Sequence, residues 1–288
     1  MKSICFFASY YTEPALPYYV EVYLKELKNH FTDVVFLNSG NDLSAPAIDF
    51  LAKQNIRYTT DQNEGFDFGL WYKAFQRYDT SAYDQVALVN DSCILFKPLT
   101  GFVNWSKGND ADFQGMTFSE AIAPHLQSYF LVINQRAISH VHDYFMGNGL
   151  LKTINEVIIR YEVGLSTYLL SKGMKMAAYI DNNGYRGEFS PYYHCINYHL
   201  EKGVPLIKKK IMFSSYRKDE MFTLARMNFK INPSHYIKLI KKVNADLILD
   251  FEKLMSEARS KMRISTKLAY ETKRFGILIL HVFSKEKK

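Results

Sequence analysis

Tyr-Asp-Gln-Val-Ala-Leu-Val-Asn-Asp-Ser-Cys-Ile-Leu-Phe-Lys-Pro, residues 83–98, is the stretch that decides the predicted fold. Within it, residues 86–89 form a short apolar run, which is typical of a strand buried on both faces of a mostly parallel sheet. Asn90, Asp91 and Ser92 follow directly. Ligands of open α/β sheets bind beyond the carboxyl ends of the strands, so these side chains can face a substrate or a cation. The same triplet also suits a plain turn, in which the side chains bond their own backbone.

Strand-like and helix-like segments alternate along the first 180 residues, which favours βαβ units. The helical segments carry apolar residues at 3.6-residue spacing, as at Val20, Leu24 and Leu27. We therefore expect an α/β fold with a mostly parallel sheet flanked by helices. The expected strands are residues 3–8, 33–37, 56–59, 86–89, 110–117, 127–134 and 176–180, and the expected helices are residues 18–30, 47–53, a segment ending near 77, 136–145, 151–160 and 162–172.

The composition is that of a globular protein with one large core, since 48% of the 288 residues are hydrophobic. Cys5, Cys93 and Cys195 are scattered outside any CxxC pair, so neither a zinc site nor a disulfide framework is predicted, and we expect a reducing cytoplasm. The apolar run at the start is too short for a secretory signal. No segment reaches the ~18 consecutive apolar residues of a membrane span.

The net charge of +7 is unevenly distributed along the chain. Residues 1–200 carry 15 Lys and Arg against 20 Asp and Glu, whereas residues 201–288 carry 21 against 9. We expect a main domain over residues 1–210 and a basic helical extension over residues 211–288, with helices at 246–261 and around 275–283. A basic amphipathic helix suits an anionic membrane surface. Nucleic acid is the other common polyanion, and a solvated helix docked on the domain is a third interpretation.

Residues 63–71, Asn-Glu-Gly-Phe-Asp-Phe-Gly-Leu-Trp, form a loop that leads into a helix. Gly65 permits a positive φ or a close backbone approach, and the amides of a helix N-terminus can receive phosphate. The segment lacks a glycine of the GxGxxG fingerprint, so a dinucleotide cofactor is not predicted. An ordinary strand-to-helix turn explains the same residues.

Five segments, taken in order, resemble the rhamnan synthesis protein F family of bacterial polysaccharide enzymes, and more broadly glycosyltransferases of the GT-A type. They are residues 63–71, 88–92 (Leu-Val-Asn-Asp-Ser), 112–117 (Asp-Phe-Gln-Gly-Met-Thr), 125–130 (His-Leu-Gln-Ser-Tyr-Phe) and 204–210 (Val-Pro-Leu-Ile-Lys-Lys-Lys). The resemblance covers most of residues 1–215. It implies a GT-A fold and the transfer of a sugar from a nucleotide donor, with L-rhamnose from a dTDP-linked donor as the precedent.

The resemblance also implies a cation site, although an incomplete one. GT-A enzymes usually carry an Asp-x-Asp motif after the central strand, where carboxylates hold a cation that neutralises the leaving diphosphate. Asn90-Asp91-Ser92 occupies that place here, so one carboxylate remains. We expect Asp91 and His194 to bind Mg²⁺ or Mn²⁺, with His199 as the alternative histidine. Metal-independent catalysis and plain packed histidines stay open.

Glu162 is the first candidate for the catalytic base and Glu120 the second. Residues 161–170 are similar to the Glu-Asp-x-x-Leu-Ser helix of family 2 glycosyltransferases, in which a carboxylate takes the proton of the acceptor hydroxyl. We expect Glu162 in the first turn of its helix. By the same resemblance, donor binding is assigned to Tyr10, Asn63, Gly65, Asp67, Asn90, Asp91 and Ser92, with Asp67 serving the donor or the acceptor, and acceptor binding to His125 and Gln127.

Together these features predict an inverting single displacement on a dTDP-, UDP- or GDP-linked sugar. The expected acceptor is a growing cell-surface glycan on a lipid carrier, at the inner face of the cytoplasmic membrane. Two other classes stay open. A nucleic-acid-binding protein would use the basic C-terminus, although no RNP, helix-turn-helix or zinc pattern appears. A GT-A domain that binds a nucleotide sugar without transferring it would explain the replaced carboxylates.

Overall fold

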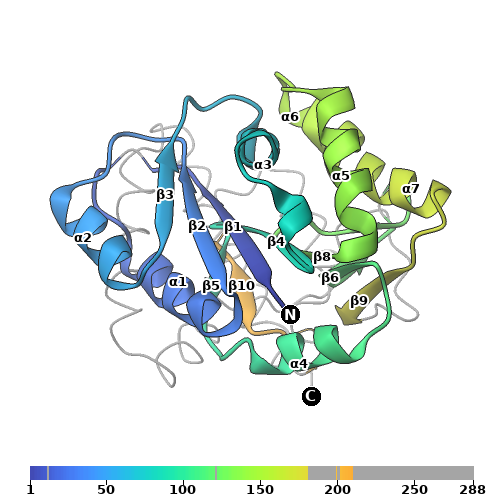
Figure 1. The fold of residues 1–288 in the computed structure, drawn as a ribbon, viewed down its shortest axis with the longest axis horizontal. Helices are drawn as coiled ribbons and strands as arrows, with labels where there is room; N and C mark the ends of the chain where they lie inside the picture. The colour runs from blue at the N-terminus through green and yellow to red at the C-terminus, as the bar shows by residue number, and fades with distance from the viewer. Residues whose placement is uncertain (12, 121, 181–198, 200–201, 210–288) are drawn as a thin grey trace, which may run out of the picture. The chain divides into compact units, whose positions relative to one another are not determined.

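The structure is a computed structural model that describes residues 1–11, 13–120, 122–180, 199 and 202–209. The chain divides into two units, Met1–Ile207 and Lys208–Lys288. The first unit carries the sheet and its helices (Figure 1). The helices expected at 246–261 and around 275–283 lie outside the described residues, as does the whole basic extension, residues 211–288. None of the helices in the described part of the chain has the length and apolar content to span a bilayer.

Strands and helices alternate through the first half of the chain, as the sequence predicts. The elements there are β1 (Ser3–Ser9), α1 (Tyr18–His30), β2 (Asp33–Asn38), α2 (Ala45–Lys53), β3 (Arg57–Thr60), α3 (Phe66–Arg77), the 3₁₀-helix η1 (Thr80–Ala82) and β4 (Gln85–Asn90). The second half contains β5 (Cys93–Leu95), α4 (Thr100–Gly108), β6 (Phe113–Ser119), β7 (His125–Leu126), β8 (Phe130–Asn134), α5 (Gln135–Asn148), α6 (Ile154–Glu156), the π-helix η2 (Val157–Val163), α7 (Gly164–Ser171), β9 (Met176–Ile180) and β10 (Leu206–Lys208).

The main sheet has the order β3-β2-β1-β4-β8-β6-β7, with β9 beside β6, and β10 pairs with β5 in a small second sheet. β3, β2, β1 and β4 are parallel to one another. β8 runs antiparallel to both β4 and β6, so β6 and its parallel neighbour β9 point in the same direction as β4. The predicted α/β fold with a mostly parallel sheet is confirmed, and β8 is the reversed strand in its middle.

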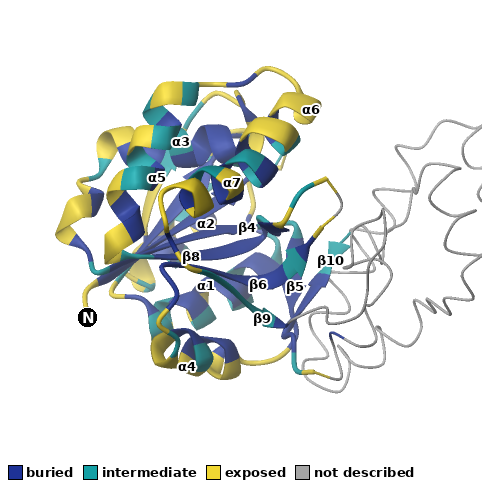
Figure 2. Ribbon diagram, turned by 90° about the vertical axis from the view of Figure 1, so that its right-hand side faces the viewer, coloured by how far each residue is buried: buried dark blue, intermediate teal, exposed yellow. Residues whose placement is uncertain are grey.

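Both faces of the sheet are covered by helices, as the strand sequences require. Successive side chains of β1 point to opposite faces. Phe6 packs toward α3, with its ring centroid 6.0 Å from that of Phe75, and Phe7 packs toward α1, 5.3 Å from the ring of Tyr23. Figure 2 shows buried strands between helices whose outer faces are exposed, with α3, α5 and α7 over one face and α1 and α4 over the other. This arrangement explains why β1 and β4 are apolar without alternation.

Parts of the chain differ from the prediction. Residues 110–112 and 127–129 precede β6 and β8 instead of belonging to them, and η1, β7 and β10 are not predicted. The helices expected at 151–160 and 162–172 form one helical run from Ile154 to Ser171, because Gly164 adopts a helical φ of −64° and does not break it. The expectation that Glu162 lies in the first turn of a helix is therefore wrong. β5 and α4 are additional elements, and β5 is only three residues long, too short to leave a periodic signal.

A tight backbone approach fixes the connection between β3 and α3. Gly69, in the first turn of α3, lies against the carbonyl oxygen of Glu64, and a Cβ added at Gly69 would be 1.8 Å from that oxygen. Gly65, which precedes α3, has a φ of +75°. Glycine is thus required at residue 69 by space and favoured at residue 65 by backbone conformation.

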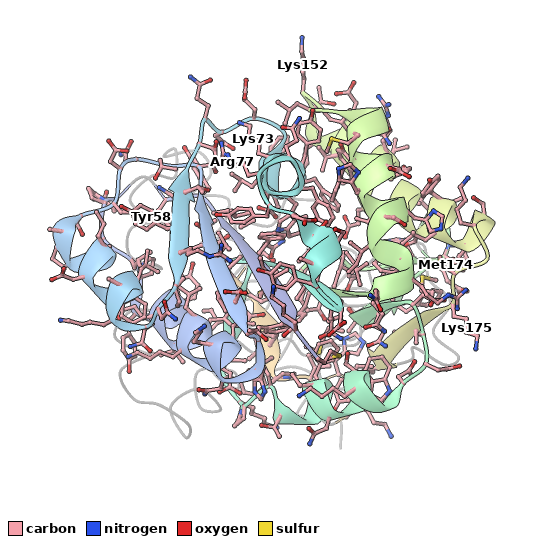
Figure 3. The ribbon with its side chains drawn as sticks, in the orientation of Figure 1. Tyr58, Lys73, Arg77, Lys152, Met174 and Lys175 are labelled. Atoms are coloured by element: carbon pink, nitrogen blue, oxygen red, sulfur yellow. The ribbon has the colours of Figure 1, made fainter. Side chains whose placement is uncertain are left out.

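Two basic side chains of α3 hold the same connection (Figure 3). Lys73 Nζ donates a hydrogen bond of 2.9 Å to the carboxylate of Glu64. Arg77 donates two hydrogen bonds to Asp61, the residue directly after β3. The guanidinium of Arg77 holds the pKa of Asp61 below its ordinary value of 3.8. The segment that leads into α3 is therefore fixed by packing and by charge.

The close contact at Gly69 predicts that two glycine-to-alanine substitutions have very different effects on the free energy of unfolding. Gly69→Ala should destabilise the fold by about 1–3 kcal/mol or more, because the new methyl group overlaps backbone. Gly147→Ala is the matched control, since an added Cβ in the last turn of α5 meets no atom within 4 Å. Alanine is the better helix former, so this variant should gain up to about 1 kcal/mol. Urea unfolding of both variants measures the difference, and equal stabilities would contradict the contact.

Candidate active site

Buried polar residues lie at the edge of the sheet where the parallel strands end. Asn38 and Ser9 are paired at the ends of β2 and β1, and Asn90 at the end of β4 is paired with Ala8. Ser9, Asn38 and Asn90 are all buried. Because β8 is antiparallel to β4, it begins at this edge, where Phe130 pairs with Val89. Side chains from both the ends and the beginnings of strands therefore meet here, as in the ligand-binding crevices of open α/β sheets.

Asn90 connects three parts of this edge and is only 3% exposed. Its Nδ2 donates a hydrogen bond of 2.7 Å to the carboxylate of Asp67, at the start of α3. Its Oδ1 accepts from the hydroxyl of Ser92 at 2.6 Å and from the amide of Ser92 at 3.1 Å. Its own backbone amide donates to the carbonyl of Tyr129 at 3.4 Å. The side chain uses its donor and its acceptor at once, which an amide does and a carboxylate does not.

Asp67 is presented to Asn90 by an unusual turn. Gly65 and Phe66 both have positive φ, +75° and +57°. The left-handed region is uncommon for an aromatic residue, and backbone conformations of this kind cluster at ligand and active sites. Phe66 is 42% exposed, so burial of its ring does not explain the turn. The turn instead brings the carboxylate of Asp67 to the end of β4.

Asp91 lies beside two tyrosines. Its backbone amide donates to the carbonyl of Ala8 at 3.1 Å, and its Oδ2 accepts a hydrogen bond of 3.3 Å from the hydroxyl of Tyr19 in α1. Burial raises the pKa of Tyr11 well above its usual range, and the adjacent negative charge of Asp91 raises it further. Tyr11 therefore stays a neutral hydroxyl next to the carboxylate, available as a hydrogen-bond donor.

Glu162 lies within η2 and is held by the β7–β8 connection. Its Oε1 accepts a hydrogen bond of 3.2 Å from the backbone amide of Ser128 and one of 3.1 Å from the Ser128 hydroxyl. The side chain is half-buried. A π-helix is rare, and short π-helical segments inside α-helices often occur at functional sites. A carboxylate with this exposure and these fixed donors suits proton transfer or ligand binding.

A short chain of contacts links Glu162 to Asp91. Ser128 binds Glu162, the next residue Tyr129 accepts a hydrogen bond from the amide of Asn90, and Asp91 follows Asn90 in the sequence. The two carboxylates that the sequence predicts as the main site residues are thus connected through the same edge of the sheet. Their roles in binding and proton transfer stay predictions.

The other predicted residues fall into two groups. Tyr10, Asn63 and Glu120 are exposed in the connections that follow β1, β3 and β6, at the same edge as Asn90. His125 and Gln127 are buried and bonded inside the protein: His125 Nδ1 contacts the carbonyl of Ala123 at 2.7 Å, and Gln127 Oε1 accepts from Thr117 at 2.9 Å. Their role in acceptor binding stays a prediction, and neither side chain is displayed at the surface.

Of the predicted metal ligands, Asp91 and His199 lie among the described residues, and His194 lies outside them. His199 is fully buried, and burial lowers its pKa to about 4, so its imidazole is neutral at pH 7. Among the described residues, no group of three or more His, Cys, Asp and Glu side chains is arranged to hold a metal ion. The described donors therefore do not form a complete cation site.

Ser128 and Tyr19 are the contact residues that the sequence analysis missed. Ser128 lies in one of the quoted segments, but its bond to Glu162 joins residues 34 positions apart. Tyr19 has the spacing of a core residue in α1 and is 2% exposed, and its hydroxyl reaches Asp91 across 72 positions. A local pattern carries no signal for either contact.

A groove of about 600 Å³ lies at the opposite edge of the sheet, between the end of α3 and the first half of α5. Phe75, Tyr83 and His142 are among its lining residues. None of the predicted site residues lines it. The candidate site therefore lies at the edge that holds Asn90.

This fold, with polar side chains where its parallel strands end, defines an α/β protein with a mostly parallel sheet flanked by helices. The chain belongs to the rhamnan synthesis protein F family, whose model matches residues 35–287. The predicted family and the predicted α/β architecture are both confirmed. A comparison with curated proteins finds no match.

Solved structures with a similar chain path include three enzymes. A protein described as a glucose-1-phosphate thymidylyltransferase of Bacillus anthracis is 10% identical, with a TM-score of 0.44 over 64% of this chain and 88% of its own. 4-diphosphocytidyl-2C-methyl-D-erythritol synthase of Anaerococcus prevotii is 10% identical, with a TM-score of 0.43 over 69% and 96%. The glycosyltransferase GlyE of Streptococcus pneumoniae is 13% identical, with a TM-score of 0.40 over 84% and 62%. Likenesses at this level do not determine the function of the chain.

The hydrogen bond between Asn90 and Asp67 predicts that substitutions at these two residues have non-additive effects on the free energy of unfolding. Asp67→Ala should lower the free energy of unfolding by about 1–3 kcal/mol, because it leaves the buried amide of Asn90 without this acceptor. Asn90→Ala removes the other half of the same bond, so the double variant should lose less than the sum of the single losses. Asp49→Ala, at an exposed aspartate of α2, is the control and should change stability by less than about 0.5 kcal/mol. Strict additivity of Asp67→Ala and Asn90→Ala in urea unfolding would contradict the contact.

Proposed function

We propose that this chain is a glycosyltransferase that moves a sugar from a nucleoside-diphosphate donor to a glycan acceptor. Membership of the rhamnan synthesis protein F family supports this activity. The observation that carries the proposal is the linked pair of carboxylates, Asp91 and Glu162, at the edge where the strands end. One carboxylate would serve the donor and the other the acceptor.

The donor would lie over the ends of β1 and β4. Asp67, Asn90 and Ser92 form a fixed polar group there, and Asp91 is held beside Tyr19. Tyr10 is 52% exposed after β1, and its ring offers a surface for stacking a nucleoside base. Amides at the start of α3 and the glycine-containing turn before it suit a phosphate group. These residues would orient the donor with its diphosphate near Asp91.

The acceptor hydroxyl would lie against Glu162. In an inverting displacement, the carboxylate takes the proton of this hydroxyl as its oxygen attacks the anomeric carbon. A new C–O bond forms on the face opposite the donor bond, the bond from the anomeric carbon to the diphosphate oxygen breaks, and the nucleoside diphosphate leaves with that electron pair. One carboxylate base is enough for this reaction, because no covalent intermediate with the protein forms.

A divalent cation, Mg²⁺ or Mn²⁺, would neutralise charge on the leaving diphosphate. Asp91 is the described carboxylate that would hold it, and His194 is the proposed histidine outside the described residues. Because the described residues do not group three ligands, no step of the mechanism is assigned to the cation. Donor binding by the chain, measured with and without added Mn²⁺ by titration calorimetry, tests this part. Equal affinities would count against a role for the cation.

The sugar we propose is L-rhamnose, the precedent that the family name provides. The acceptor would be a glycan of a cell-surface polysaccharide on a lipid carrier, at the inner face of the cytoplasmic membrane. The 21 Lys and Arg among residues 201–288 support binding to an anionic bilayer surface. Equal co-sedimentation of the full chain with anionic and neutral vesicles would contradict the membrane part of the proposal.

Glu162→Gln and Glu120→Gln in the full chain test the assignment of the base. Glu162→Gln should lower kcat by about 10²–10⁴-fold and leave donor affinity nearly unchanged, because the amide keeps the size of the side chain but does not accept the proton. Glu120→Gln should stay close to the unmodified chain. The measurement is release of nucleoside diphosphate from dTDP-, UDP- and GDP-linked sugars in the presence of acceptor glycan.

Two outcomes would change the proposal. A large loss in Glu120→Gln with none in Glu162→Gln would move the role of the base to Glu120. Binding of a nucleotide sugar without turnover by the unmodified chain, with any of these donors, would favour a GT-A domain that binds the donor and does not transfer it.

A further inference from the structure

The carboxylate of Glu162 is fixed by a residue of another element instead of by its own helix. Both donors to Oε1, the amide and the hydroxyl, belong to Ser128 in the β7–β8 connection. Among the described residues, Oε2 accepts no hydrogen bond. Within the described part of the chain, the two oxygens of this carboxylate thus have different surroundings: Oε1 is held by two donors and Oε2 by none.

A second contact joins the same helix to β7, directly before that connection. Ser166 Oγ accepts a hydrogen bond of 3.2 Å from the backbone amide of Leu126, and Ser166 is fully buried. Glu162 and Ser166 are four residues apart, and such residues lie on one face of a helix. The helix is therefore fastened to residues 125–129 at two points. Only the contact at Glu162 involves an ionisable group.

The helix around Glu162 is also shaped to reach this connection. Glu162 lies in the π-helix, which ends at Val163. Gly164, the next residue of the helical run, packs against Tyr144 of α5. A Cβ added at Gly164 would be 2.5 Å from the tyrosine hydroxyl oxygen. The Tyr144 hydroxyl donates to the carbonyl of Arg160 in the same turn. The distorted turn is thus supported by α5, and the orientation of Glu162 is supported by Ser128.

We propose that Ser128 is a positioning residue for Glu162: it holds Oε1 with two hydrogen bonds, so that Oε2 takes the proton of the acceptor hydroxyl. The catalytic half of this inference rests on the proposed function, whereas the contact itself does not. Two hydrogen bonds to one carboxylate oxygen restrict the rotation of the side chain, so Ser128 fixes the direction in which the second oxygen of Glu162 points.

The chain offers a matched pair of variants for the test, Ser128→Ala and Ser166→Ala. Each removes one serine hydroxyl from the contact between the helix and residues 125–129, but only Ser128→Ala removes a donor to Glu162. Two readouts are taken on the full chain. The first is kcat and the KM for the donor, from release of nucleoside diphosphate. The second is the ¹³C carboxyl resonance of Glu162 at a single pH, assigned by its absence in Glu162→Gln.

In Ser128→Ala we expect a fall of about tenfold in kcat and a KM for the donor within about twofold of the unmodified chain. The carboxyl resonance of Glu162 should shift, because Oε1 loses its hydroxyl donor. Ser166→Ala should lower Tm by a similar amount to Ser128→Ala, with kcat and this resonance unchanged. Ser128→Thr keeps a hydroxyl and should restore both.

Equal changes in kcat and in the carboxyl resonance of Glu162 in Ser128→Ala and Ser166→Ala would overturn the positioning role. No change in either variant would overturn it as well. If Ser128→Ala does not fold, Ser128→Cys replaces it, because a thiol is a weaker donor and should give a smaller shift in the same direction. A failure of the proposed function can be distinguished from a failure of the positioning role. If the unmodified chain turns over no donor, the carboxyl resonance still decides whether Ser128 holds Glu162 by hydrogen bonds.

Discussion

The hydrogen bonds of the Asn90 side chain are the constraint on which the rest of the site depends. Its side-chain amide donates a hydrogen bond to Asp67 and accepts two from Ser92, while its backbone amide donates to the carbonyl of Tyr129. An aspartate in its place would put two negative carboxylates about as close as 2.7 Å, the present separation of Nδ2 and Oδ2. The asparagine at residue 90 therefore has a physical reason, since its amide can lie against the carboxylate of Asp67.

The sequence predicts what depends on local patterns. The apolar run of β4 and the three polar residues after it are unambiguous, because the run is short, continuous and followed directly by turn-forming side chains. The reversed strand β8 is different, since its pairing with β4 is decided by partners more than 40 residues apart. The contacts of Tyr19 and Ser128 with Asp91 and Glu162 also span long separations, so only the folded chain brings these residues together.

The helix that carries Glu162 shows how a small error of prediction changes the electrostatics of a site. In the first turn of a helix, a carboxylate is stabilised by the helix dipole and by free backbone amides. Glu162 lies instead inside a continuous helical run, where the backbone amides are occupied by the helix itself. The amide and hydroxyl of Ser128 take over that stabilising role from outside the helix.

The pairing of β1 with β4 has a consequence for how accurately the site must be assembled. Asn90 lies opposite Ala8, the last residue but one of β1. Side chains alternate between the two faces of a sheet, so a slip of β4 by one position would turn Asn90 from the face of α3 to that of α1. Asp67 and the asparagine amide would then be separated by the sheet itself. The alignment of two central strands, set during folding, thus decides whether the polar group exists at all.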